Sequence, residues 1–597
     1  MLPVAIVGGG PVGLVSSILL SMRKIPHVIF EQFPGTSIHP KACGLNQRTM
    51  EIFRHIGVER EVVKHRAPLN VAGKTGWYTN IGPNGREIYS RDSWGGGKYQ
   101  EEYRRASPAQ YSTLAQIRLE PILQRRALEI APNCISYNSK VTSVKEKGDK
   151  VVLTVDRGNR GSEDVEAQYV LGADGGRGLA ESLGIGWEGE SDIVDMFTAH
   201  FNADIASIHP NKAVFISWLV NPKLRGSRGS GYLYHLGPYY PTREKKEEWV
   251  LASPKHPEDP VEFDEKTMVE RIRRSLEIPD LDLSLRSISN WTVNAKVAER
   301  YRSEGGRIFL VGDACHRVPP WGALGMNSGI QDAHNLIWKL GLALKSGQPT
   351  KYSNFLDTYE KERRPIAQRV ARNSLHNMLN HNNIMDGALD ITAETSTEEN
   401  LASVAAYFDE SHELYKEKRE RVRQAAADLD NEFHAPGIEI GWFYESADIN
   451  GEGLAARHGG QLLADGTFDI NNYHPSTIPG HHVPHSWLRK GDTTISTRDL
   501  VELDKFVLLT GKSGIWESVP NDLIHVQVID GEAGWTDIEG TWAQLRGVDE
   551  DGAVLIRPDG IVAWRARNSE PSSTSKLTAL VQSLLYQKSD RRWATHM

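Results

Sequence analysis

The first 31 residues constrain the fold more than any other part of the sequence. An apolar, strand-like run leads directly into Gly8, Gly10 and Gly13, which form the pattern G-x-G-x-x-G. A helical pattern follows, and a second apolar run at residues 27–30 ends in Glu31. Glycines allow the backbone to approach a pyrophosphate, a helix N-terminus offers free N–H groups, and an acidic side chain can bind a ribose. The order strand, turn, helix, strand predicts a nucleotide-binding α/β domain, but this motif does not separate NAD from FAD.

Residues 307–340 indicate a flavin nucleotide. They read as a buried strand, a loop rich in Gly and Pro, and then a helix with one apolar face. Asp313 ends the strand, where a carboxylate can bind the hydroxyls of a ribityl chain. Gly325, Met326 and Asn327 place backbone N–H groups at the start of the helix. This arrangement favours the negative charge on the pyrimidine end of a reduced flavin.

The composition and charge exclude several classes of protein. The 597 residues suffice for about two to four domains. With 77 acidic and 69 basic residues, the net charge is -8 and no run of Lys or Arg indicates a nucleic-acid or anionic-membrane surface. Three cysteines, at Cys43, Cys134 and Cys315, are too few for a disulfide scaffold or a structural zinc cluster, and we predict no metal site. No signal peptide or apolar stretch of ~20 residues is present, so we expect a cytoplasmic protein outside the membrane.

Several motifs between residues 4 and 365 resemble the single-component FAD-dependent aromatic hydroxylases, the family of p-hydroxybenzoate hydroxylase and phenol 2-monooxygenase. The family pattern G-D-A-x-H-x-x-P-P-x-G continues through residues 312–340. The D-G motif is present at Asp174, a helix resembling one that contacts FAD begins at Gln116, and residues 359–365 resemble Y-x-x-E-R-x-P. Residues 40–51 and 433–441 are similar to the phenol and chlorophenol hydroxylase branch.

The resemblance implies an α/β fold. A Rossmann-like FAD-binding domain would carry an inserted, mostly antiparallel substrate-domain sheet and be followed by a thioredoxin-like domain. The predicted boundaries are 1–185 and 291–385 for the two parts of the FAD-binding domain, with 70–112 contributing to the substrate pocket, 186–290 for the substrate sheet, 386–435 for a helical linker and 436–597 for the thioredoxin-like domain. Because no cysteine follows Cys315, the last domain lacks C-x-x-C and cannot exchange disulfides, so we expect a packing or dimerisation role.

The resemblance also assigns residues to FAD. The predicted cofactor-binding residues are Gly8, Gly10, Pro11, Val12, Gly13, Glu31, Lys41, Arg48, Gln116, Asp174, Asp313, Pro320, Gly325, Met326 and Asn327. Many relatives carry Arg at the position of Lys41, so we expect Arg48 to bind more of the pyrophosphate. Cys43 stands where some phenol hydroxylases place an acidic residue near the substrate, and it cannot serve as the same base.

The expected activity is aromatic monooxygenation. In the family, NADPH or NADH reduces the bound FAD, O2 adds to form a flavin hydroperoxide, and its terminal oxygen attacks an electron-rich ring. We therefore expect a small phenolic or polyketide-type aromatic substrate, O2 and a transiently bound NAD(P)H as partners, and a homodimer. Baeyer–Villiger chemistry, oxidative decarboxylation, a reductase, a halogenase and a non-enzymatic flavoprotein scaffold are the alternatives, although the halogenase segment G-W-x-W-x-I-P is absent.

The candidate catalytic residues are Pro320, Tyr232, Tyr234 and His235. In the family, the carbonyl of the second proline in the flavin loop faces the substrate, which points to Pro320. Tyr232 and Tyr234 share one face of a predicted strand and His235 points to the other, so a tyrosine could bind the phenolic oxygen. Packing is the alternative for each of these side chains, and also for Trp77, Trp94 and Trp321, which could line an aromatic pocket.

Overall fold

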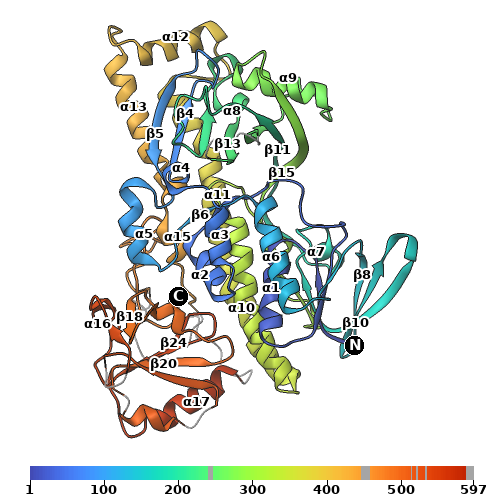
Figure 1. Cartoon of the computed structure of the whole chain (residues 1–597), viewed down its shortest axis with the longest axis vertical. Coiled ribbons are helices and arrows are strands. Elements are labelled where there is room, and N and C mark those ends of the chain that lie inside the picture. Colours follow the sequence, from blue (N-terminus) through green and yellow to red (C-terminus); the bar gives the residue numbers. More distant parts are fainter. Residues whose placement is uncertain (240–245, 446–457, 513, 520–521, 531–533, 586–597) are drawn as a thin grey trace.

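The computed structural model describes residues 1–239, 246–445, 458–512, 514–519, 522–530 and 534–585. Figure 1 shows three regions along the long axis of the molecule: a sheet with helices at the top, a central region of helices beside a second sheet, and a smaller region below. The long helix α11 (Ser353–Ala388) connects the top and central regions. The mixture of sheets and helices confirms the predicted α/β class.

The central region contains the predicted nucleotide-binding unit. β1 (Leu2–Val7), α1 (Pro11–Met22) and β2 (His27–Phe30) follow one another along the chain, and β1 and β2 pair in parallel. Val4 packs into the core on one face of the sheet, and Ala5 packs into the core on the other. A parallel strand buried on both faces needs a continuous apolar run, which is what β1 has.

This sheet has seven strands, in the order β7-β2-β1-β10-β9-β8, with β16 also paired to β10. The pairs of β1, β2, β7, β10 and β16 are parallel, whereas β8 and β9 add antiparallel strands at one edge. The remaining bounds are β7 (Ile135–Ser136), β8 (Lys140–Lys147), β9 (Lys150–Asp156), β10 (Ser162–Gly172) and β16 (Ile308–Leu310). β16 comes from much later in the chain than the other strands. The central sheet is therefore built from segments that precede and follow, in sequence, most of the strands of the top sheet.

The top region is an eight-stranded sheet in the order β17-β15-β11-β14-β13-β12-β4-β5. Only the β12–β4 pair is parallel, which confirms the predicted, mostly antiparallel sheet. The strands are β4 (Lys74–Tyr78), β5 (Glu87–Asp92), β11 (Trp187–Ala203), β12 (Ile216–Leu219), β13 (Tyr232–Gly237), β14 (Glu248–Pro254), β15 (Leu283–Ala298) and β17 (His316–Arg317). Two of them, β4 and β5, come from within residues 70–112.

Helices then lead to the C-terminal region. After α10 (Gly325–Lys345) and α11, the chain forms α12 (Thr397–Phe408), α13 (Tyr415–Asp428), α14 (Asp430–Phe433) and α15 (Pro436–Ile440). The C-terminal region has a mixed sheet in the order β21-β20-β23-β24, in which only β20 and β21 are parallel. Its bounds are β20 (Phe506–Thr510), β21 (Ile524–Val528), β23 (Ala553–Ile556), β24 (Val562–Ala566) and the following helix α17 (Ser573–Leu585). β23 and β24 pair as an antiparallel hairpin, and the sequence Pro-Asp-Gly at residues 558–560 lies in its turn.

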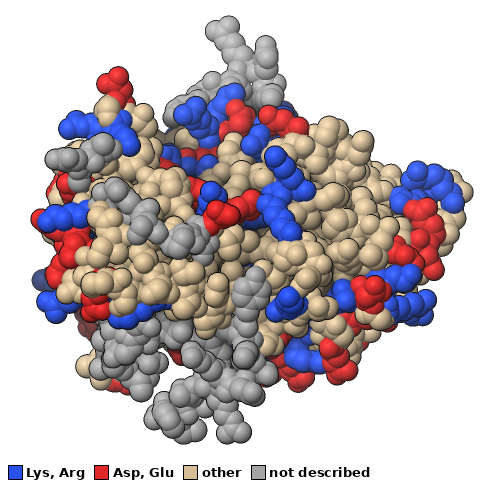
Figure 2. Space-filling model, turned by 90° about the horizontal axis from the view of Figure 1, so that it is seen from below, with Lys and Arg blue, Asp and Glu red and all other residues tan. Residues whose placement is uncertain are grey.

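The surface carries both signs of charge. On the face drawn in Figure 2, Lys and Arg are interspersed with Asp and Glu rather than gathered into a field of one sign. Among the helices that the structure describes, none combines the length and apolar character needed to cross a membrane.

Candidate active site

The three motif glycines have different surroundings. A Cβ at Gly8 would lie 2.2 Å from the carbonyl oxygen of Ala173, and a Cβ at Gly13 would lie 2.0 Å from that of Gly8. These two glycines therefore permit close backbone packing. A Cβ at Gly10, the residue before the first turn of α1, would meet nothing within 4 Å. The space beside a helix N-terminus without a side-chain cap fits the pyrophosphate of FAD.

Glu31, which directly follows β2, stabilises the glycine loop by hydrogen bonds. One of its carboxylate oxygens accepts a hydrogen bond from the Gly9 N–H at 2.6 Å, and the other accepts one from the Phe33 N–H at 2.9 Å. A carboxylate has further lone pairs, so both oxygens can still accept a ribose hydroxyl. The predicted position of Glu31 beside the glycine loop is therefore what the structure has.

Asp313 follows β16, its side chain is exposed, and positively charged side chains lie near it. Loss of hydration raises the pKa of Asp313, and the charges of His316, Lys41 and Arg317 oppose this effect. Lys41 is exposed and has a positive φ of 51°. These residues thus combine a carboxylate for hydroxyl groups with cations for phosphates, which suits the two halves of FAD.

Asn327, near the start of α10, joins two segments that are predicted to bind the flavin. Its side-chain oxygen accepts a hydrogen bond from the Asn46 N–H at 3.0 Å, and its Nδ2 donates to the carbonyls of Gly44 at 3.0 Å and Ala323 at 2.6 Å. The first turn of α10 has no side-chain cap, so its N–H groups stay available for an anion. Gly325 and Met326 lie in that same turn.

Two residues predicted to bind FAD, Arg48 and Asp174, form hydrogen bonds with other residues of the protein. Arg48 binds the carboxylate of Glu51 and donates to the carbonyl of Ile440 at 3.0 Å, and Glu51 also pairs with Arg498. Arg48 thus ties α2 (Gln47–His55) to the C-terminal region, and its expected role at the pyrophosphate stays a prediction. Asp174 accepts hydrogen bonds from the N–H groups of residues 176, 177 and 179, so it orders its own loop.

Gln116 begins α6 (Gln116–Ile130), as the sequence predicts. Its backbone N–H donates to the carbonyl of Ala42 at 2.8 Å, and its side chain donates to Glu120 at 2.6 Å. Val12 and Pro11 lie in the first turn of α1. The segment around Ala42 is therefore held against α6 on one side and against α10 on the other.

Tyr232 and Tyr234 lie on the face of β13 that packs against Cys43. Their ring centroids are 6.2 Å apart, and the Tyr234 hydroxyl donates to the carbonyl of Lys41 at 3.4 Å. Burial raises the pKa of both tyrosines, so each hydroxyl keeps its proton and acts as a donor. Burial also raises the pKa of the Cys43 thiol to about 12, so this cysteine cannot act as a base at neutral pH.

His235 lies apart from the two tyrosines. Its ring stacks on Trp249, with centroids 4.3 Å apart, and burial lowers the pKa of His235 to about 4. Adjacent residues of a strand point to opposite faces of a sheet, which accounts for this separation. The structure does not bring His235 together with the other candidates.

Trp77, Trp94 and Trp321 belong to one buried aromatic cluster, together with Trp218 and Phe433. Trp321 directly follows Pro320, whose carbonyl accepts a hydrogen bond from the Ala323 N–H at 3.0 Å. The centroid of the Trp218 ring lies 4.8 Å from the centroid of the Tyr232 ring and 6.5 Å from that of the Trp321 ring. Trp218 is not among the residues predicted for the site; it lies on β12, and its register opposite Tyr232 on β13 places both side chains on the same face.

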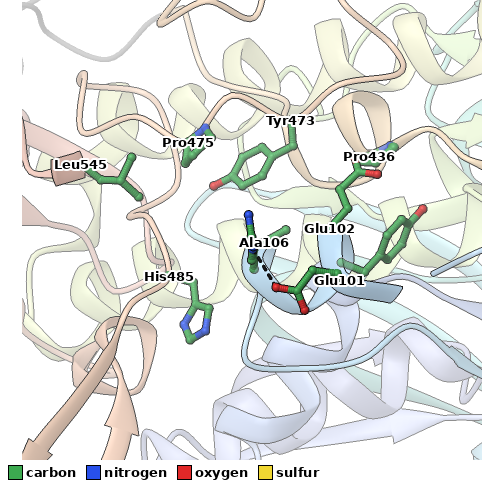
Figure 3. A pocket seen from close by; sticks show the side chains of 10 residues that line it. Glu101, Glu102, Ala106, Pro436, Tyr473, Pro475, His485 and Leu545 are labelled. Atoms are coloured by element: carbon green, nitrogen blue, oxygen red, sulfur yellow. Dashed lines mark hydrogen bonds and ion pairs between the residues drawn. The ribbon is translucent and has the colours of Figure 1, made fainter. Parts of the chain in front are cut away.

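A separate groove lies between α5 (Gln100–Ala106) and loops of the C-terminal region (Figure 3). Its volume is about 350 Å³, and the side chains around it include Glu101, Arg105, Tyr473 and His485. Glu101 and Arg105 form an ion pair at 2.7 Å. None of the predicted cofactor or catalytic residues lines this groove.

Comparison with known families now decides the class of protein. The FAD binding domain family matches residues 1–374, and the C-terminal domain family of aromatic-ring hydroxylases matches residues 476–586. The chain belongs to the FAD-dependent aromatic-ring hydroxylases. Membership confirms the predicted family, the enzyme class and FAD as the bound cofactor, and the family implies NAD(P)H as the reductant.

Individual relatives match this hydroxylase over nearly its whole length. The 4-methyl-5-nitrocatechol 5-monooxygenase of Burkholderia sp. is 30% identical, covering 98% of this chain and 97% of that protein. Phenol 2-monooxygenase of Pseudomonas sp. (strain EST1001) is 30% identical, covering 95% of this chain and 90% of that protein. Among solved structures, the flavin-dependent monooxygenase PieE, in complex with FAD and substrate, has a TM-score of 0.88 at 31% identity, covering 98% of this chain and 99% of that chain.

Proposed function

We propose that this hydroxylase uses NADPH or NADH and O2 to insert one oxygen atom into an electron-rich phenol or a phenol-bearing polyketide. The observation that carries the proposal is the aromatic cluster around Trp218, which meets Tyr232 at the flavin-binding segment of Cys43. Phenolic rings are the substrates named for the relatives acting on phenol and on 4-methyl-5-nitrocatechol. A buried site with aromatic walls suits a flat ring with hydroxyl substituents.

One set of residues is suited to bind FAD, and another is suited to bind the substrate. Gly10, Glu31, Asp313 and Asn327 are the groups that would hold FAD, for the reasons of space, charge and hydrogen bonding given above. When bound and reduced, FAD would supply the activation of O2 for transfer of one oxygen atom to the ring. The tryptophans exclude water from the reacting groups, and the Tyr232 hydroxyl donates a hydrogen bond to the phenolic oxygen.

Replacing Tyr232 by phenylalanine should preserve FAD binding and slow hydroxylation. A hydrogen bond to a charged oxygen contributes about 1.5–3 kcal/mol, so kcat/KM for the phenol should fall about 10- to 100-fold. Tyr234→Phe is the matched control, because the Tyr234 hydroxyl already donates to the Lys41 carbonyl. Steady-state oxidation of NAD(P)H with each variant checks this; unchanged turnover in Tyr232→Phe would retire the role.

The proposed reaction is tested by NAD(P)H oxidation with a panel of phenols, catechols, resorcinols and hydroxyquinones. We expect oxidation to be slow without a ring compound and to be stimulated by a subset of the panel, with a product that gains one oxygen. Equal oxidation rates with and without every compound, and no oxygenated product, would contradict the proposal.

A further inference from the structure

The last turns of α11 bring a histidine into the aromatic cluster. His381 is fully buried, with its ring centroid 3.9 Å from that of Trp218 and 6.1 Å from that of Trp77. Its Nδ1 lies 2.8 Å from a carboxylate oxygen of Glu432 on α14, and Glu432 is also buried. This histidine–carboxylate pair therefore joins the end of α11 to α14, the short helix that also carries Phe433 of the aromatic cluster.

The other ring nitrogen of His381 has no hydrogen-bond partner among the residues that the structure describes. A carboxylate only accepts hydrogen bonds, so Nδ1 donates to Glu432, and in the neutral imidazole the lone pair is then on Nε2. Burial raises the pKa of Glu432, while its pairing with His381 and the charge of Arg91 oppose this effect. The same logic orients the base in hydrolase triads, where a carboxylate fixes the tautomer and balances the charge of the imidazolium.

Other buried polar atoms of the cluster and of α11 share this lack of a partner within the described part of the chain. They are Nε1 of Trp77, Nε1 of Trp321 and both polar side-chain atoms of Asn377, one helical turn before His381. A Cβ at Gly322, in the flavin loop, would lie 3.5 Å from Asn377 Nδ2. A group of unpaired buried donors and acceptors is unfavourable for packing alone, and it suits an aromatic ligand that carries several oxygen atoms.

We propose that His381 is the catalytic base for the phenolic substrate and that Glu432 is the residue that positions it. The assignment rests on the proposed function and adds His381 to the candidate catalytic residues that the sequence indicated, which are Pro320, Tyr232, Tyr234 and His235. The phenolic O–H bond breaks, its proton moves to Nε2 of His381, and the electron pair stays on the oxygen. The resulting phenolate is more electron-rich at the ring carbons, and the imidazolium is balanced by Glu432. After oxygen transfer, the imidazolium returns the proton to the product oxygen.

Binding of 4-nitrocatechol to the oxidised, FAD-loaded protein tests the proposal without turnover. Its phenolate absorbs at longer wavelength than the neutral form, so a difference spectrum reports the ionisation of the bound probe. We expect the wild-type protein to bind the probe ionised at a pH at which the free probe is mostly neutral. His381→Gln should bind it neutral, while His376→Gln, which changes an exposed histidine of the same helix, should match the wild type.

Kinetics give a second readout. General-base catalysis typically contributes at least about 100-fold, so His381→Gln should lose about that factor in kcat for hydroxylation, with FAD content and KM little changed. Glu432→Gln keeps an acceptor for Nδ1 and removes the charge, so it should show an intermediate loss and partial ionisation of the probe. If His381→Gln fails to retain FAD, Glu432→Gln decides the question.

An ionised bound probe in His381→Gln, a neutral or unbound probe in the wild type, or a fully ionised probe in Glu432→Gln would overturn the proposal. Failure of the proposed function has a different signature. In that case the wild type would ionise the probe through His381, yet no phenol of the panel would gain oxygen when NAD(P)H and O2 are supplied.

Discussion

Replacing Glu362 by glutamine is expected to destabilise the protein by about 3–5 kcal/mol, because it removes the anion of a buried ionic cluster. Glu362 lies on α11 and accepts hydrogen bonds from Lys339 of α10 at 2.7 Å and from both terminal nitrogens of Arg557 at 2.6 and 2.9 Å. Arg557 lies in the turn of the β23–β24 hairpin and also pairs with Asp559. The cluster thus holds the C-terminal region against the helices of the FAD-binding part.

The size of the effect follows from burial. The side chains of Lys339 and Glu362 are 0% and 4% exposed, so no water can replace the lost carboxylate. Burial already lowers the pKa of Lys339 to about 8, and Glu362 opposes this effect. In Glu362→Gln, only Asp559 remains to balance two buried cations. Glutamine has nearly the same size as glutamate, so the loss is electrostatic.

Unfolding in urea, followed by tryptophan fluorescence, measures the change in the free energy of unfolding. Glu304→Gln is the control, because Glu304 is exposed and its ion pair with Arg300 lies in solvent, where a pair stabilises little. We expect no resolvable shift of the control's midpoint. Equal midpoints for Glu362→Gln and the wild type would show that the cluster does not stabilise the fold.

The second large effect is expected at Gly10. Its φ of -73° suits alanine, and an added Cβ would meet no protein atom within 4 Å. The apoprotein of Gly10→Ala should therefore unfold at the urea concentration of the wild-type apoprotein. The methyl group would occupy space that the pyrophosphate needs; because overfilling a packed site costs about 1–3 kcal/mol, FAD affinity should fall about 10- to 100-fold.

Gly8→Ala provides the contrasting control. Gly8 has a φ of +108°, and a Cβ there would lie 2.2 Å from the Ala173 carbonyl oxygen, so this variant should destabilise the apoprotein itself. Titration of apoprotein with FAD, followed by flavin fluorescence, measures affinity, and urea unfolding measures stability. If Gly10→Ala bound FAD like the wild type, the phosphates would not lie beside this residue.

Much of the flavin-binding part could be predicted because its determinants are local. The glycine loop, the acidic end of β2 and the strand-loop-helix of residues 307–340 each lie in one continuous segment, and the structure has them in that form. Asn327 illustrates the limit of such prediction. Its place at the start of a helix is visible in the sequence, but its hydrogen bonds to Gly44 and Asn46 depend on the tertiary fold.

The substrate side could be predicted less well because distant segments build it. Trp218, His381 and Glu432 are brought together from a strand, a long helix and a short helix, and no pattern in the sequence links them. Arg48 is a second case: its place in a family motif predicts the pyrophosphate as a partner, and the fold adds Glu51 and the Ile440 carbonyl, which no sequence pattern indicates. The expected homodimer involves contacts beyond a single chain and stays a prediction.

The most direct test of the central claim is the mass of the product formed under oxygen-18 gas. The wild-type protein, loaded with FAD and supplied with NAD(P)H and a phenol that stimulates oxidation, should yield a product that contains one atom of oxygen-18. Consumption of NAD(P)H with no oxygen-18 in any ring product would contradict monooxygenation.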